Sequence, residues 1–351
     1  MYKKFLMGIA AMAALTLVSC SSDDLNSLSD NSSKNEAISF DGYLGRSAVA
    51  VNGSRGSVET KKQLKTDGFG VFGKYNADAG QNFGSDFFDN VKVYSSSTAD
   101  PVIWTYENTK YWPTEGHIDF LAYAPHVDNK TLTGSSIDFT VEGDAANQKD
   151  LLWANAIGQT KQTISVTDNK VKFQFAHALS RLGYTVKLKD DYSNVTIKLN
   201  KITLAGSNDG KGTNKAFYKK GTIDLSYTST TSSTTKLWTP SEEKQDFEWY
   251  SGDDQLSKTT AVKNPETKYL FVIPQNFSAS APDQLYVIVD YAITYSDGTT
   301  VNTKVYKQLE KEFLQGKAYT INLTIGLTPI EFNAEVNNWV DGDKIDDITW
   351  E

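Results

Sequence analysis

The sequence predicts an all-β protein, with two antiparallel β-sandwich domains after an N-terminal leader and a flexible tether. Apolar and polar residues alternate with a period of two, which is typical of half-buried strands, in runs such as FGVFGKY, HIDFLAYAP, VKFQFAH, YTVKLK, VTIKLNKITL, YLFVIP, LYVIVDYAITY and AYTINLTI. Turn signals such as Asp209-Gly210 and Asp297-Gly298 separate these runs, and no stretch shows a long 3.6-residue period. Many short strands of this spacing indicate sandwiches.

Residues 1–19 have the features of a signal peptide. Lys3 and Lys4 precede an uncharged apolar run, Phe5 to Val18, which is too short for a comfortable membrane span. The chain's single cysteine, Cys20, follows directly, and Leu17-Val18-Ser19-Cys20 fits the bacterial lipobox. We therefore predict a lipoprotein signal peptide, with acyl chains on Cys20 holding the protein at the outer membrane. The alternative is an ordinary secretory signal with a chance cysteine.

Residues 20–36 are predicted to form a flexible tether, because the segment is polar, low in complexity and free of aromatic residues. Without the signal peptide, the chain has 33 basic and 43 acidic side chains, which gives a formal net charge of −10. Nucleic acid is therefore not an expected partner, since phosphate binding needs clustered Lys and Arg.

The remaining chain is longer than a single hydrophobic core usually supports. We therefore expect two sandwich domains, at residues 37–170 and 171–351. The boundary carries an uncertainty of about ten residues. The run TSTTSSTT at 228–235 is predicted to be an exposed loop within the second domain.

Arginine is rare and unevenly placed. Of 35 basic residues only Arg46, Arg55 and Arg181 are arginine, and two of them lie early in the mature chain. One interpretation is compositional drift toward lysine. The other is that an arginine-specific protease would find little to cut except the N-terminal segment.

No catalytic constellation is recognisable, so we do not expect an enzyme, a cofactor or a metal site. His117, His126 and His177 lack zinc-ligand spacing, and no GxSxG motif occurs. GSNDGKGT at 206–213 lacks the spacing of a phosphate loop and is read as a hairpin turn. Aromatic residues, including seven tryptophans, are abundant enough for a carbohydrate platform, although they more often fill the core of an all-β protein.

Several stretches in order along the chain resemble the fimbrillins of Bacteroidetes, the Mfa-like family related to the major fimbrial subunit of Porphyromonas. They are AISFDGYLGRS, WTYENTKYWP, EGHIDFLAYAP, KDLLWA, VKFQFAHALSRL, YLFVIPQ, FLQGKAYTINLTI and IEFNAEVNNW. Together they span nearly all of the chain from residue 36 onward.

The resemblance implies two transthyretin-like domains and a pilin that is exported as a lipoprotein and assembled at the cell surface. It also implies an arginine-specific protease that removes the first strand, after which another fimbrial subunit inserts its C-terminal strand. Arg46 is the nearest candidate for the cut and Arg55 the next. The chain departs from many members at Ala48, Val49 and Ala50, where they have a Thr-Arg pair.

The residues give this mechanism a physical basis. Ile38, Phe40 and Leu44 share one face of an extended segment, so AISFDGYL is a candidate for a removable strand. At the other end, two donor candidates stay open. The first is the alternating set Ile330, Phe332, Ala334 and Val336, which would equally suit a strand of its own domain; the second is the terminal segment with Ile345, Ile348 and Trp350.

The expected function is therefore that of a fimbrial subunit polymerised by strand exchange, in a homopolymer or a mixed assembly, which supports cell adhesion. The alternatives are a monomeric surface lipoprotein that binds a glycan or peptide, and an anchor or tip subunit that does not form the stalk.

Overall fold

The computed structural model describes residues 36–44, 61–78, 80–95, 97, 102–165, 168–228, 236–265, 268–326 and, as backbone only, 331–338. These residues form β-strands joined by turns, together with two short helices, α1 (Lys61–Asp67) and α2 (Lys161–Ile164). The predicted all-β class is confirmed. No helix in the described ranges is long and apolar enough to cross a membrane.

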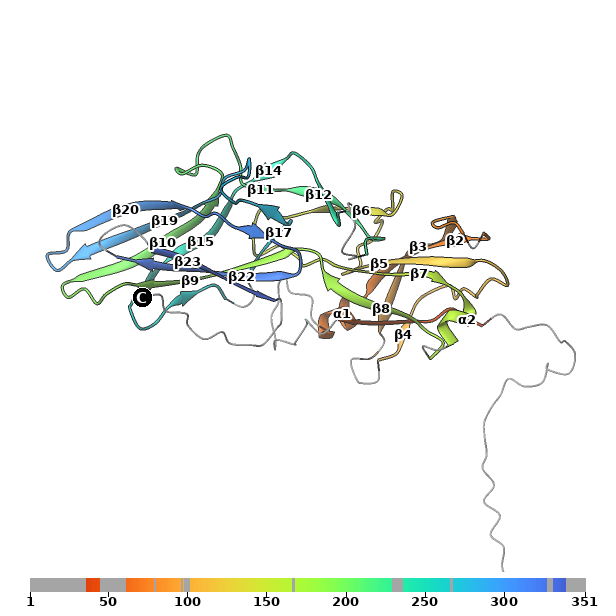
Figure 1. Ribbon diagram of the computed structural model, residues 1–351. Helices are drawn as coiled ribbons and strands as arrows, with labels where there is room; N and C mark the ends of the chain where they lie inside the picture. Colours follow the sequence, from red (N-terminus) through yellow and green to blue (C-terminus); the bar gives the residue numbers. More distant parts are fainter. Residues whose placement is uncertain are drawn as a thin grey trace, which may run out of the picture. The chain divides into compact units, whose positions relative to one another are not determined.

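A seven-stranded sheet holds the first part of the chain, and most of its strands are labelled in Figure 1. Its order is β1 (Phe40–Leu44), β8 (Val171–His177), β7 (Leu152–Gln159), β5 (His117–Ala124), β2 (Phe69–Asn76), β3 (Ser85–Ser95) and β4 (Trp104–Thr105). The alternation in β8 buries Val171, Phe173 and Phe175 and leaves Gln174 exposed. These three residues and the buried residues of β1 belong to one hydrophobic cluster, to which several strands of this sheet contribute.

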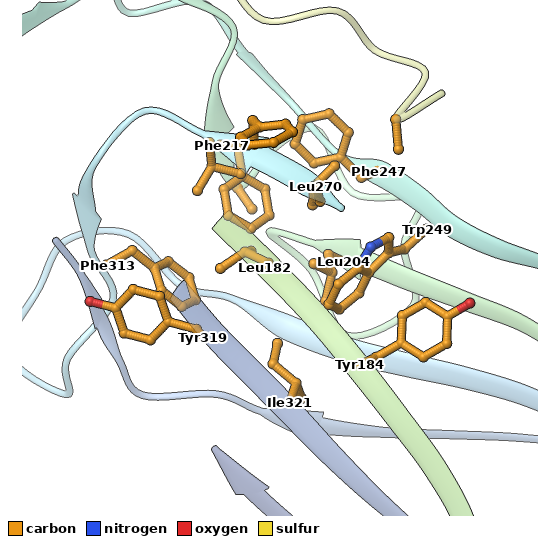
Figure 2. Close-up of a cluster of buried hydrophobic side chains, with 14 of the residues drawn as sticks. Leu182, Tyr184, Leu204, Phe217, Phe247, Trp249, Leu270, Phe313, Tyr319 and Ile321 are labelled. Atoms are coloured by element: carbon orange, nitrogen blue, oxygen red, sulfur yellow. The ribbon is translucent and has the colours of Figure 1, made fainter. Parts of the chain in front are cut away.

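Two further sheets enclose most of a second hydrophobic cluster. One has the order β15 (Phe247–Gln255), β10 (Val195–Ala205), β19 (Tyr286–Tyr295) and β20 (Thr300–Gln308). The other has the order β16 (Val262–Lys263), β9 (Ser180–Leu188), β22 (Lys317–Ile325) and β23 (Glu331–Asn338), with β17 (Leu270–Val272) also paired to β9. Figure 2 shows Leu182 and Tyr184 of β9 and Ile321 of β22 directed toward Leu204 and Trp249, which belong to the other sheet.

Short strands complete the described fold. β6 (Ser136–Thr140) pairs with β12 (Lys220–Asp224), which also pairs with β13 (Trp238–Pro240). Two small pairs join β11 (Phe217–Tyr218) to β14 (Lys244–Gln245) and β18 (Gln275–Asn276) to β21 (Glu312–Phe313). Because β6 belongs by sequence to the first half and β12 to the second, this pairing links the two halves.

The division at residue 170 stays a prediction. β8 lies in the seven-stranded sheet and β9 in the second set, so the strand pairing favours a boundary between His177 and Ser180. That position falls within the ten residues allowed by the prediction.

The sheets are antiparallel with two exceptions among the described strands. β1 runs parallel to β8, and β22 runs parallel to β9. Period-two patterns mark which residues face the core, but they carry no information about the direction of the neighbouring strand. The sequence therefore predicted the strands without predicting these two parallel pairs.

Candidate functional site

The candidate site is the position occupied by residues 36–44, at the edge of the seven-stranded sheet. β1 pairs in parallel with β8, so that Phe40 lies opposite Val171 and Leu44 opposite Phe175. The amide of Val171 donates a 2.9 Å hydrogen bond to the carbonyl of Ser39, extending the pairing before the strand proper. On this side the segment is a regular member of the sheet.

A second segment, residues 104–112, covers the other side of the same stretch; we call it the strap. The amide of Ile38 donates to the carbonyl of Lys110 at 2.8 Å, and the amide of Trp112 donates to the carbonyl of Glu36 at 3.0 Å. The backbone of residues 36–38 is therefore bonded to the strap, and residues 39–44 to β8 and its preceding turn.

Tyr106 fixes the strap to the strand. Its hydroxyl donates to the carbonyl of Ile38 at 2.7 Å and accepts from the amide of Lys110 at 3.2 Å. Burial raises the pKa of Tyr106 above its usual value, although the hydrogen bond with Lys110 acts in the opposite direction. The hydroxyl therefore keeps its proton, and its donor role, at neutral pH.

The inward side chains of this segment are fully enclosed. Ile38 and Phe40 are 2% exposed and Leu44 is 4% exposed. The Phe40 ring lies 5.4 Å from the rings of Tyr106 and Phe120, 5.6 Å from Phe88 and 5.8 Å from Phe173, measured between centroids. Burying a side chain of this size contributes about 1.5–3 kcal/mol, so these three residues supply most of the apolar attachment of β1.

Gly42 is the fourth inward position, and sequence reasoning missed its importance. A Cβ at this position would lie 2.9 Å from Cε1 of Phe69 and 3.3 Å from Cε2 of Phe175, closer than a methyl group normally packs. Three of the inward positions, 38, 40 and 44, hold large apolar side chains. Position 42 leaves no space for a side chain. The signal was the lone glycine within an alternating run.

The C-terminal donor candidates are only partly placed. β23 pairs antiparallel with β22, with Phe332 opposite Leu323, Ala334 opposite Ile321 and Val336 opposite Tyr319. It is the last strand in its sheet order, so the alternating segment forms a strand with its own chain, as one of the open interpretations allowed. Ile330, Ile345, Ile348 and Trp350 lie outside the described residues.

The lipid-attachment and cleavage candidates, Cys20, Arg46 and Arg55, also lie outside the described residues. Arg46 is two residues beyond the end of β1, and Arg55 is six residues before α1. The third arginine, Arg181, lies within β9 with its guanidinium 4.4 Å from the centre of the Tyr269 ring.

Two of the histidines, His177 and His117, lie close to buried aspartates. Nδ1 of His177 lies 2.7 Å from Oδ2 of Asp150, and both side chains are buried. Nε2 of His117 lies 3.6 Å from Asp119, whose carboxylate accepts from the amides of Phe83 and Gly158. Within the described ranges no three His, Cys, Asp or Glu side chains are grouped to hold a metal ion.

The remaining motifs also have structural explanations. In 206–213, Asp209 accepts from the amide of Lys211 at 2.8 Å, which is a local turn. The turn connects β10 to β11, which pair with other strands, so the expected hairpin was wrong in detail. Of the tryptophans, Trp112, Trp238 and Trp249 are 1%, 6% and 7% exposed, as expected of core residues.

Comparisons with known proteins agree with this fold. A family model described as fimbrillin-like matches residues 57–339. A fimbrial protein from Bacteroides vulgatus has a similar structure, with a TM-score of 0.65, 21% identity, and coverage of 87% of this chain and 100% of that one. A candidate cell adhesion protein from Bacteroides uniformis is similar with a TM-score of 0.50, 19% identity, and coverage of 87% and 98%. No curated protein matches. Since the family model spans most of the sequence, the chain belongs to the fimbrillin-like family.

Proposed function

We propose that this protein is a fimbrial subunit of the cell surface, polymerised by strand exchange at the β1 site. The β1 site comprises the surfaces of β8, the strap and the rings that contact Phe40. Family membership supports the subunit role, the cell-surface location, a structural and not an enzymatic task, and assembly with other fimbrial subunits. The name of the Bacteroides vulgatus relative is consistent with this role.

The observation that carries the proposal is the position of β1. It is an edge strand whose apolar face is buried, and both candidate arginines follow it before the next element begins at Lys61. Cleavage at Arg46 or Arg55 would separate β1 from the remainder of the chain. Its departure would expose Phe173 and Phe175, along with unpaired backbone groups of β8, which is a template for strand addition.

The same cut would release the subunit from the membrane. In the proposal the acyl chains on Cys20, the tether 20–36 and β1 form one continuous N-terminal piece. The precursor is then held at the outer membrane until an arginine-specific protease acts. Two acyl chains are enough for stable anchoring, so a subunit that lacks the N-terminal piece would no longer be held in the membrane by lipid and could join a fimbria.

Limited proteolysis tests the proposal. The secreted chain carrying Cys20→Ser would be digested with an arginine-specific protease and followed by mass spectrometry and size-exclusion chromatography. We expect cleavage after Arg46 or Arg55 and growth of oligomers. Arg46→Lys with Arg55→Lys should prevent both, whereas the control Arg181→Lys should prevent neither. Loss of β1 without oligomer growth would overturn strand exchange.

An anchor or tip subunit is the second candidate. It is favoured by the pairing of β23 with β22 of the same chain, because a strand engaged with its own sheet is not free to donate. Such a subunit would accept a strand at the β1 site without passing one on. In the digestion it would form short complexes with a stalk subunit and no filaments of its own.

A further inference from the structure

Residues 133–151 lie between β5 and β7 in the sequence, yet they pair with strands of the second half of the chain; we call this segment the clamp. Its strand β6 runs antiparallel to β12, with Ile137 opposite Ile223 (Figure 1). Beyond the strand, the amide of Val141 donates a 2.8 Å hydrogen bond to the carbonyl of Lys219. The first half therefore supplies a strand to a sheet of the second half.

The clamp also contributes to the hydrophobic core of the second half. Ile137, Val141 and Leu151 are buried in the same cluster as Leu182 and Phe247. The seven-stranded sheet reaches this cluster too, through three buried side chains of β2 and β5: Phe72, Leu121 and Tyr123. Parting the two halves would expose this shared apolar surface to water, which is unfavourable.

Two amide side chains join the halves. Oε1 of Gln148, a buried residue of the clamp, accepts from the amide of Phe271 in β17 at 2.6 Å, and its Nε2 donates to a carbonyl within the clamp at 2.8 Å. Nδ2 of Asn155 in β7 donates to the carbonyls of Leu225 and Tyr227, at 2.8 and 2.9 Å. A buried polar group that loses its partner is destabilising, so these bonds favour the state in which the halves are together.

The connection between β8 and β9 lacks the features of a hinge. Ala178 and Leu179 are completely buried. The amide of Ala178 donates to the carbonyl of Leu151 in the clamp at 2.8 Å, and its carbonyl accepts from the indole of Trp238 at 2.7 Å. The carbonyl of Leu179 accepts from the amide of Gly316 at 2.9 Å. Linkers that permit domain motion are exposed and flexible, whereas this one is enclosed and bonded.

We propose that the clamp makes the two halves one mechanical unit, and that Gln148 and Asn155 hold it in place. The halves then lose their structure together, and a load applied to one half passes to the other. Residues 36–351 do form one compact unit. Such a subunit would transmit tension along a filament without its halves parting. This property would hold with or without strand exchange.

Coupled unfolding tests the clamp. The Cys20→Ser chain would be unfolded in urea and followed by hydrogen-exchange mass spectrometry, with peptides from β8 reporting on the first half and peptides from β19 on the second. We expect one urea midpoint for both halves. Gln148→Met with Asn155→Leu removes the amide bridges at similar side-chain length, and it should separate the two midpoints by about 0.5 M or more.

The matched control removes two amides that bond locally. Nδ2 of Asn147 donates to Asp144 within the clamp, and Nε2 of Gln159 donates to the carbonyl of Ile157 within β7. Asn147→Leu with Gln159→Met should therefore leave a single midpoint. Separate midpoints in this control would overturn the proposal, because loss of any amide bond, and not of a bridge between the halves, would then divide the chain.

A disulfide across the clamp supplies a rescue. Asp138 lies opposite Thr222 in the pairing of β6 with β12. Asp138→Cys with Thr222→Cys, added to the Gln148→Met and Asn155→Leu chain and oxidised, should restore a single midpoint, and reduction should separate the midpoints again. If that chain does not fold before the cysteines are added, the oxidised disulfide should restore the fold of both halves.

Three further results would overturn the clamp. The first is two midpoints in the Cys20→Ser chain itself. The second is a single midpoint in the chain that lacks both amide bridges. The third is an oxidised disulfide that restores neither the single midpoint nor the fold.

Discussion

β1 and β23 have similar alternating sequences and are held in different ways. β1 is parallel to β8, and residues 36–38, which precede it, are bonded to the strap. β23 is antiparallel to β22 and, among the described strands, has no partner on its other side. Sequence pattern therefore specifies which face of a strand is apolar, whereas the neighbours decide how firmly it is held.

The largest effect should come from the ring at the centre of the β1 site. Phe40→Ala removes a 2% exposed side chain that contacts four other rings, and a buried phenylalanine lost in this way costs about 3–5 kcal/mol. Urea unfolding of the intact Cys20→Ser chain would measure the loss. Tyr43→Ala, at a 42% exposed position of the same strand, is the control and should cost much less. Equal losses would mean that β1 is not held by its apolar face.

Gly42 should be next. Gly42→Leu places a branched side chain against Phe69 and Phe175, and overpacking of this kind costs about 1–3 kcal/mol. The expected result is a lower urea midpoint and faster hydrogen exchange at the amide of Val171, which donates to Ser39. The matched substitution Ala334→Leu in the intact chain probes β23 and should leave exchange at Val171 unchanged. Acceleration by both substitutions would remove the distinction between the strands.

The strap should contribute less. Tyr106→Phe removes the hydrogen bond to the Ile38 carbonyl and keeps the ring, and one such bond is worth about 0.5–1.5 kcal/mol. We expect faster hydrogen exchange at the amides of Ile38 and Trp112. Tyr111→Phe, whose side chain is 53% exposed, serves as the control. Unchanged exchange in Tyr106→Phe would show that the backbone bonds alone hold the strap.

The smallest effect is a pH dependence at the strap. Burial raises the folded-state pKa of Tyr106 above that of the unfolded chain, so its contribution is complete below about pH 10 and is lost as the pH rises through the folded value. β1 should therefore be held less firmly in alkaline solution. Hydrogen exchange at Ile38, corrected for its intrinsic pH dependence, would measure this, and Tyr106→Phe should reduce the dependence. A pH dependence unchanged by the substitution would assign it to another group.

The all-β fold and its strands could be predicted from the sequence because period-two alternation reports directly on burial. This holds for Ile38, Phe40 and Leu44, which are buried on one face of the segment, as their spacing predicted. The parallel neighbours of β1 and β22 could not be predicted, since direction depends on chain connections that lie far apart in sequence.

The candidate site was predicted only in outline. The requirement at Gly42 comes from Phe69 and Phe175, and the strap is distant in sequence, so neither could be found from residues 36–44 alone. Cys20, Arg46, Arg55, Ile330, Ile345, Ile348 and Trp350 stay predictions, because they lie outside the described residues.

A disulfide that holds β1 in place is the most direct test of strand exchange. Gln174 lies opposite Tyr43 in the pairing of β1 with β8. The chain carrying Cys20→Ser, Tyr43→Cys and Gln174→Cys would be oxidised, cleaved with the arginine-specific protease and divided into a reduced and a non-reduced sample, with the Cys20→Ser chain as the control. The account predicts oligomers only in the reduced sample and in the control. Oligomer growth in the oxidised sample, or none after reduction, would contradict it.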